Sequence, residues 1–135
     1  MSSPAADTPD TTAAVIAYLN AALTPPVSSK TPNPRPASFV TVRRTGGVTQ
    51  TRVSDAPQLT IECWAGSDIT AFALAADVRK LLAEMADGTN RDGVIVYRVV
   101  EFSGPAYQPD TASLQDRVRW TVQVHARQAA TASSS

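Results

Sequence analysis

The stretch Arg117-Val118-Arg119-Trp120-Thr121-Val122-Gln123-Val124-His125-Ala126-Arg127 decides the fold of this chain. Apolar residues occupy every even-numbered position of the stretch, and polar or basic residues occupy every odd-numbered one. A period of two is typical of a β-strand with one buried and one solvent-facing side. We therefore expect a long strand near the end of the chain, with its even-numbered side chains directed into a hydrophobic core.

Two helices precede this strand. The first is expected to begin with Thr8 as its N-cap and Pro9 at its first helical position, and to stop before Pro25-Pro26. The second is expected over residues 69–87, because apolar residues recur there at three- and four-residue spacing. Gly88 follows it as a typical residue beyond a helix C-terminus.

A β-hairpin is expected over residues 39–53. Its strands are residues 39–44 and 48–53, and Thr45-Gly46-Gly47 is a tight-turn signal between them. Residues 54–57 predict the next turn, and a further strand follows from Leu59 to Trp64.

The strand expected over residues 94–102 is apolar on both faces, which favours a central position in the sheet. Residues 103–114 predict a long loop, and the Pro-rich residues 24–37 predict an extended connector without helix or sheet pairing. Residues 1–8 and 128–135 are expected to be flexible tails.

These elements predict a single α+β domain over residues 1–135. Its sheet is expected to be mostly antiparallel, with about four to five strands packed by two helices and with a protruding β-hairpin.

Composition restricts the class of protein. A chain of 135 residues suits one domain with a sizeable core, and a formal net charge of zero gives no long-range attraction to nucleic acid or to an anionic membrane. No stretch approaches the length of a membrane span, and the first residues do not have the pattern of a signal peptide. We expect a soluble protein made in a reducing cytoplasm.

Few residues suggest chemistry. The single histidine, His125, lacks the partners that a general base or a metal site needs, and Cys63 is expected to be a buried structural thiol. Asp110 and Asp116 flank the predicted long loop and offer a weak alternative, a divalent-cation site. We expect no catalytic residues, no bound cofactor and no metal.

Arginine is the candidate interaction residue, since ten of the twelve basic residues are Arg. Protein interfaces enrich Arg, but a genome rich in G and C also favours it, so both explanations stay open. Trp64 lies on the Thr60 and Glu62 side of its strand, as an interface anchor or as a packed core residue. The candidate interaction residues are Arg43, Arg44, Arg52, Trp64, Arg117 and Arg119.

The chain resembles the tail terminator, or tail completion, proteins of long-tailed bacteriophages, particularly those of actinobacterial hosts. The resemblance covers roughly residues 11–127 and lies in the order of its pieces. These are the helix TAAVIAYL (12–19), the strand PASFVTV leading into RRTGG (36–47), DAPQLTIECW (55–64), the helix AFALAADVRKLL (71–82), EFSGP (101–105), PD (109–110) and the closing RVRWTVQV (117–124).

This resemblance implies a structural virion protein, made in the host cytoplasm, that assembles as a homo-hexameric ring on the head-proximal end of the tail tube. The ring stops tube polymerisation and contacts the tail tube protein and the head–tail connector protein, while DNA only passes through its lumen. Alternatives are another head–tail joining or minor tail protein, or a monomeric module that binds an acidic partner or nucleic acid through the basic hairpin. An enzyme with an unrecognised site is a third class. Nucleic-acid binding lacks support because no aromatic residue lies on the polar face of the closing strand.

Overall fold

A computed structural model describes residues 10–48, 54–110, 112–113 and 115–129. Within these residues the chain forms two helices and one seven-stranded sheet, which is an α+β fold as predicted. The helices are α1 (Thr11–Ala22) and α2 (Asp68–Met85). The strands are β1 (Val27–Ser28), β2 (Phe39–Val48), β3 (Ser54–Ala65), β4 (Asn90–Arg91), β5 (Val94–Glu101), β6 (Ala106–Tyr107) and β7 (Asp116–Gln128).

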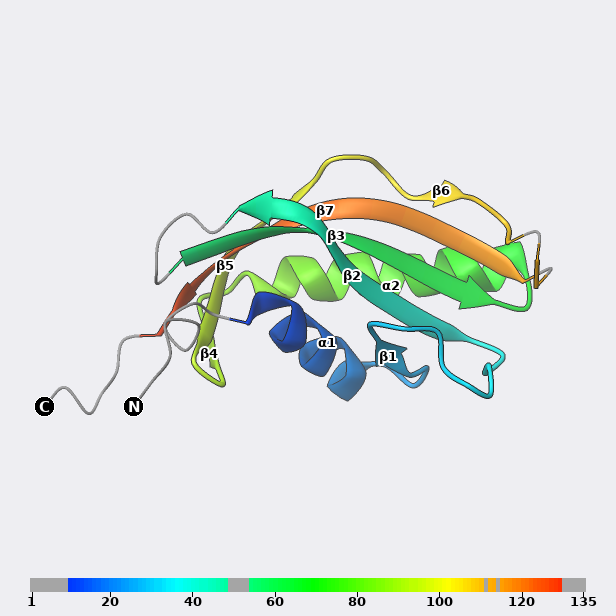
Figure 1. Cartoon of the computed structure of the whole chain (residues 1–135), viewed down its shortest axis with the longest axis horizontal. Coiled ribbons are helices and arrows are strands. Elements are labelled where there is room, and N and C mark those ends of the chain that lie inside the picture. Colours follow the sequence, from blue (N-terminus) through cyan, green and yellow to red (C-terminus); the bar gives the residue numbers. More distant parts are fainter. Residues whose placement is uncertain (1–9, 49–53, 111, 114, 130–135) are drawn as a thin grey trace, which may run out of the picture.

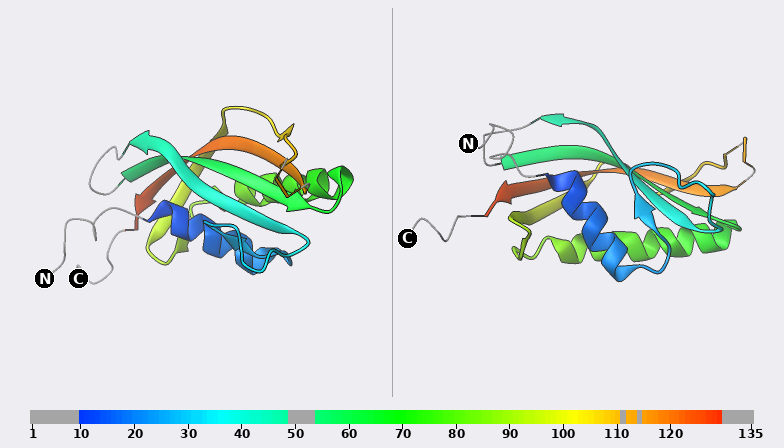
Figure 2. Two further views of the ribbon diagram at one scale, coloured as in Figure 1. Left: turned by 45° about the vertical axis from the view of Figure 1, so that its right-hand side comes forward. Right: turned by 60° about the horizontal axis from the view of Figure 1, so that its bottom comes forward.

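The sheet has the strand order β1-β2-β3-β7-β5-β4, and β6 pairs with β7 off this path. All its pairs are antiparallel except β1 with β2. The sheet curls, and both helices cover the same face of it (Figures 1 and 2). Three of the strands are only two residues long, which explains why the sequence predicts four to five strands and not seven.

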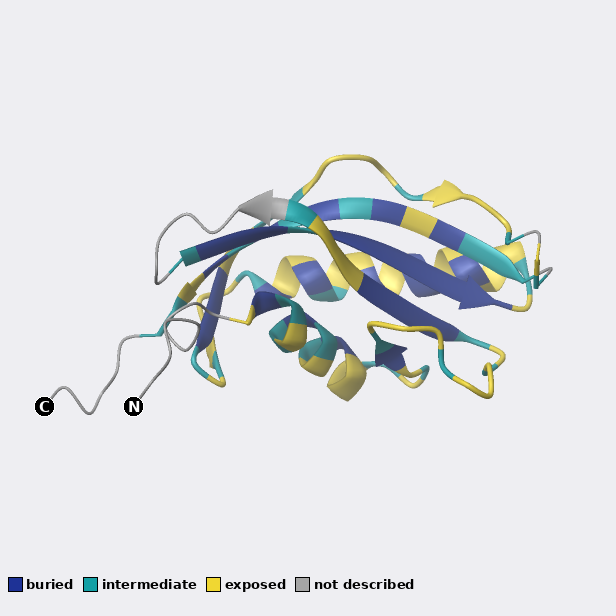
Figure 3. Ribbon diagram, viewed as in Figure 1, coloured by how far each residue is buried: buried dark blue, intermediate teal, exposed yellow. Residues whose placement is uncertain are grey.

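The closing strand β7 lies between β3 and β5, and its alternation is confirmed. Every even-numbered residue from Val118 to Ala126 is at most 1% exposed. These side chains meet the helices, together with those of Leu59, Ile61 and Cys63 from β3, so the core lies between the sheet and the two helices. Figure 3 shows that β3 is buried along nearly its whole length, as expected for a central strand.

The strand β5 corrects the prediction for residues 94–102, because it lies towards the margin of the sheet. It pairs with β7 on one side, but on the other side β4 pairs only with Val94 and Ile95. Its first three residues are buried, whereas Tyr97 is 46% exposed and Phe102, just beyond the strand, is 54% exposed. Tyr97 and Phe102 therefore face solvent and not a second covering layer, whereas Val99 and Val100 are half-buried and Val99 packs against the core.

The turn of the predicted hairpin is placed at the wrong residues. Gly46 and Gly47 lie inside β2 and pair with Gln58 and Pro57 of β3, after a register shift that follows Arg44. Glycine suits such a bulge as well as it suits a turn, which is why the sequence signal misleads. Residues 54–57 are likewise strand and not turn. Residues 49–53, between β2 and β3, lie outside the described residues.

The Pro-rich connector also contains sheet pairing that the sequence analysis does not predict. Val27 is 3% exposed, and β1 pairs in parallel with Val40 and Thr41 of β2. The backbone N–H of Val27 donates to the Asn20 side chain, and that of Val40 donates to the Pro26 carbonyl. A single buried valine after two prolines therefore fixes the connector on the sheet margin.

The helix boundaries differ slightly from those predicted. The N-cap of α1 is Asp10, whose carboxylate accepts the Ala13 N–H at 3.1 Å; Thr8 and Pro9 lie outside the described residues. Ser67 caps α2 by accepting the Thr70 N–H. Gly88 has φ +79°, the left-handed conformation expected of it just after a helix. The predicted long loop contains β6, which pairs with Arg119 and Val118.

Candidate interaction surface

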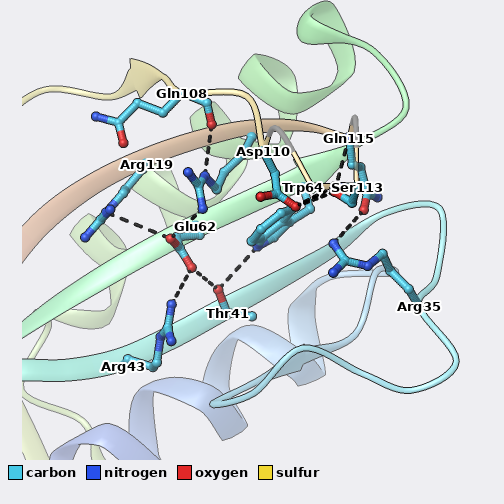
Figure 4. Close-up of polar contacts among 11 residues, drawn as sticks. Arg35, Thr41, Arg43, Glu62, Trp64, Gln108, Asp110, Ser113, Gln115 and Arg119 are labelled. Carbon is cyan, nitrogen blue, oxygen red and sulfur yellow. Dashed lines mark hydrogen bonds and ion pairs between the residues drawn. The ribbon is translucent and has the colours of Figure 1, made fainter.

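A buried carboxylate organises the face of the sheet opposite the helices. Glu62 of β3 is 2% exposed, and its Oε1 accepts from the Thr41 hydroxyl and from Arg43, both at 2.9 Å. Its Oε2 accepts from Arg117 at 3.4 Å and forms an ion pair with Arg119 at 3.9 Å. Figure 4 shows Thr41 and Arg43 approaching Glu62 from β2 and Arg119 approaching it from β7. We call Arg43, Arg117 and Arg119 around Glu62 the arginine face.

Strand register brings these residues together. Glu62 is directly opposite Thr41 of β2 and Arg119 of β7, and Trp64 is directly opposite Phe39 and Arg117. Because side chains alternate between the two faces of a sheet, residues two apart on these strands share the face away from the helices. The odd-numbered polar residues of the closing stretch are thus the β7 part of this face.

Trp64 is packed and not half-exposed, which settles the alternatives left open by the sequence. It is 5% exposed and stacks on Phe39 with ring centroids 5.2 Å apart and an interplanar angle of 12°. The guanidinium carbons of Arg35 and Arg117 lie 5.2 and 5.0 Å from its ring. Its indole N–H donates to the Thr41 hydroxyl at 3.4 Å, which joins it to the Glu62 cluster.

Two loops hold the arginines over this tryptophan. Arg117 donates to the Gln108 carbonyl at 2.9 Å, and Arg35 donates to the Gln115 side chain at 3.2 Å. The Gln115 amide in turn donates to the Ala37 carbonyl at 2.9 Å. The segment before β2 and the segment before β7 are thereby tied together above the sheet.

The arginine face carries surplus positive charge. Three guanidinium groups share the one carboxylate of Glu62, whose two oxygens cannot satisfy all their donors. The side chains of Arg43 and Arg119 are 58% and 44% exposed, whereas that of Arg117 is 20% exposed. Arg43 and Arg119 therefore present donors to solvent from positions fixed by a buried anion, an arrangement suited to carboxylate or phosphate oxygens.

Arg44 does not belong to this cluster. It pairs opposite Leu59, whose side chain is in the core, so it lies on the helix side of the sheet. It donates twice to Asp55, at 3.1 and 3.2 Å, and Asp55 also accepts from the Thr11 hydroxyl at 3.3 Å. Arg44 thus ties β2 to the first turn of α1. Arg52 lies outside the described residues.

Sequence reasoning missed Glu62, Thr41 and Arg35. The alternation of β3 did place Glu62 on the same face as Trp64, and Arg117 and Arg119 share one face of the closing strand. What the sequence lacks is the information that β3 and β7 are neighbours, because their residues lie far apart along the chain.

Apart from Tyr97, the large exposed apolar residues of the described chain come from α2, β6 and the position just after β5. Ile69 and Phe72 of α2 are 79% and 44% exposed, and Tyr107 of β6 is 43% exposed. Phe72 and Tyr107 stack with ring centroids 6.3 Å apart. With Phe102, which follows β5, we call these residues the apolar flank.

The remaining titratable candidates have structural partners. Burial raises the pKa of the Cys63 thiol, and burial with the nearby Arg98 charge lowers the pKa of His125, which lies beside Tyr97. Asp110 accepts from Ser113, and Asp116 accepts from the Tyr107 hydroxyl. Within the described residues, no three His, Cys, Asp or Glu side chains are grouped to hold a metal ion.

Comparison with known proteins gives no further constraint: no protein-family model matches this chain, and no curated protein matches it. Neither helix of the described residues has the length and apolar character needed to cross a bilayer.

Proposed function

We propose that this chain is a bacteriophage tail terminator. In this proposal it is a structural virion protein that forms a homo-hexameric ring on the head-proximal end of the tail tube. The ring prevents further tube subunits from adding and presents the surface to which the head connector attaches. Its partners are other copies of itself, the tail tube protein and the connector protein, and DNA only passes through the ring.

The observation that supports this proposal best is that one α+β body carries two chemically unlike surfaces. The arginine face lies on the sheet away from the helices, and the apolar flank lies on α2 and the neighbouring sheet margin. A subunit that ends a polymer must bind the last tube ring and offer a different surface outwards, so that no further tube subunit can add. Two such unlike surfaces, together with the ordered sequence resemblance, favour an assembly protein that acts without catalysis.

Deletion of the gene from its phage tests the proposal. We expect filled heads together with unattached tails, many of them longer than normal, and restoration of normal virions when the intact gene is supplied from a plasmid. Electron microscopy of the lysate measures both tail length and attachment. Tails of normal length already joined to heads in the deletion phage would refute the terminator function.

A second candidate function follows from the arginine face, whose surplus charge is fixed in place by Glu62. It is a binding module for an acidic protein segment. A fluorescent polyglutamate peptide should then bind at low salt, and the double variant Arg43→Gln/Arg119→Gln should lose most of this binding. Lys80→Gln, which removes one exposed charge from α2, is the control. Unchanged binding in the double variant would exclude this function.

A further inference from the structure

Both margins of the curled sheet are open over part of their length. On one margin, β4 covers only Val94 and Ile95 of β5, which leaves residues 98–101 without a strand partner on that side within the described chain. On the other margin, β1 covers only Val40 and Thr41 of β2, which leaves residues 42–48 similarly uncovered by any described strand. An open strand edge offers backbone N–H and C=O groups to another chain.

The β5 margin combines charged residues with an exposed aromatic side chain. Its open part carries the charges of Arg98 and Glu101, and Glu101 pairs with Arg79 of α2 at 2.7 Å, but Phe102 directly follows this part and is 54% exposed. The rest of the apolar flank comes from α2 and β6, where Ile69 is 79% exposed and Phe72 stacks with Tyr107. Exposed apolar side chains gathered beside an open edge are typical of a surface that another protein covers.

The direction of β5 determines how another strand can pair with its open edge. Each of the pairs β2–β3, β3–β7 and β7–β5 is antiparallel, so β2 and β5 run in opposite directions in one subunit. Rotation about an axis roughly along the strands keeps every strand direction. The β2 edge of a rotated second copy therefore arrives antiparallel to the β5 edge of the first, which continues the pairing already present in the sheet.

We propose that the occupant of the open β5 edge is the open β2 edge of a second copy of this chain, with the apolar flank buried beside the joint. Each subunit uses both of its unlike margins, so the contact is head-to-tail, and repetition by rotation closes a ring. This inference rests on the proposed function, because it names the contact from which the terminator ring is built.

Cysteine cross-linking tests this arrangement. Arg98 of β5 and Thr45 of β2 are both exposed and lie on the two open edges, so each can be replaced by cysteine without opening the core. The native Cys63 is buried and has a raised pKa, so it reacts little. Treatment of the double variant Thr45→Cys/Arg98→Cys with a short bis-maleimide should give a ladder of covalent multimers, severalfold above the yield from either single variant.

Two controls make the outcome decisive. The variant Thr45→Cys/Lys80→Cys carries its second thiol on the exposed side of α2 that faces the end of α1, where Lys80 lies beside Ala22 and Leu23, and should give no ladder. The reaction is run on concentrated free protein and on purified tails that carry the variants. No ladder in either sample, or dimers from Arg98→Cys alone at the same yield, would overturn the edge pairing. That failure leaves the deletion phenotype intact, whereas a ladder together with a normal deletion phenotype would overturn only the terminator function.

Discussion

Among the residues of the arginine face, Glu62 is the one whose substitution should lower the free energy of unfolding most. It is a buried carboxylate surrounded by three guanidinium groups, so Glu62→Gln leaves several cations facing one another without their shared anion. Removing one partner of a buried ionic cluster costs on the order of 3 kcal/mol of unfolding free energy. We expect a loss of this size in urea denaturation followed by circular dichroism.

The matched control is Arg43→Gln. The Arg43 side chain is 58% exposed, and Arg117 and Arg119 still neutralise Glu62 when it is gone. Its loss should therefore cost no more than about 1 kcal/mol. Equal destabilisation by the two variants would show that Glu62 does not organise the arginine face.

For single residues, the sequence predicts which face of a strand each side chain lies on, but not which side chains of other strands it contacts. Arg117, Arg119 and Trp64 are recognisable from alternation, and the burial of Cys63 follows from the same pattern and is confirmed. The separation of Arg43 from Arg44 was not predicted. Both are arginines of one strand, and only the pairing of β2 with β3 shows that one meets Glu62 while the other meets Asp55 beneath the sheet.

Asp87, two residues after helix α2, holds the turn that leads to β4. Its carboxylate accepts the Thr89 N–H at 2.9 Å and pairs with Arg91, and these interactions lower its pKa from 3.8 to about 2. A carboxyl group with a lowered pKa in the folded state stabilises the fold fully above its unfolded pKa. That contribution disappears as the pH falls from about 4 to about 2.

Asp87→Asn should therefore lower the thermal midpoint slightly at neutral pH, and in acid the midpoints of the variant and the wild type should be the same. Melting curves at pH 7 and at pH 2 measure this. The two proteins should differ at pH 7 and converge at pH 2. A constant difference across the whole range would indicate a role for Asp87 that does not depend on its charge.

Elements defined by a clear period are predictable in this chain, and those that depend on tertiary pairing are not. β7 and α2 agree with the sequence analysis to within two residues at each end. The two-residue strands β1, β4 and β6 have no period to detect, and Gly46-Gly47 gives the same signal for a bulge as for a turn. The central position predicted for β5 is wrong because an apolar pattern does not distinguish side chains covered by a second layer from exposed ones such as Tyr97 and Phe102.

In the whole molecule, the two faces of the sheet differ because both helices cover the same one. One face is covered by α1 and α2 and contains the core, and the other carries Glu62 with its arginines and is partly covered by the segments before β2 and β7 (Figures 1 and 4). The apolar flank comes from α2, from β6 and from the residue after β5. A formal net charge of zero therefore conceals a strongly uneven surface, which matters more for assembly than the total charge does.

The apolar flank supplies the last prediction, which concerns assembly and not folding. Ile69 and Phe72 are 79% and 44% exposed, so Ile69→Ser/Phe72→Ser removes apolar surface that the isolated subunit leaves largely in water. The thermal midpoint should fall by only a few degrees, since exposed substitutions cost little beyond helix propensity and the lost Phe72–Tyr107 contact. If the flank is buried between copies, the same variant should fail to restore attached tails when supplied to the deletion phage. Lys80→Ser, an exposed change elsewhere on α2, should restore them fully. Plaque counts and electron microscopy of the complemented lysates measure both results. Full rescue by the double variant would show that the apolar flank is not part of the contact between copies.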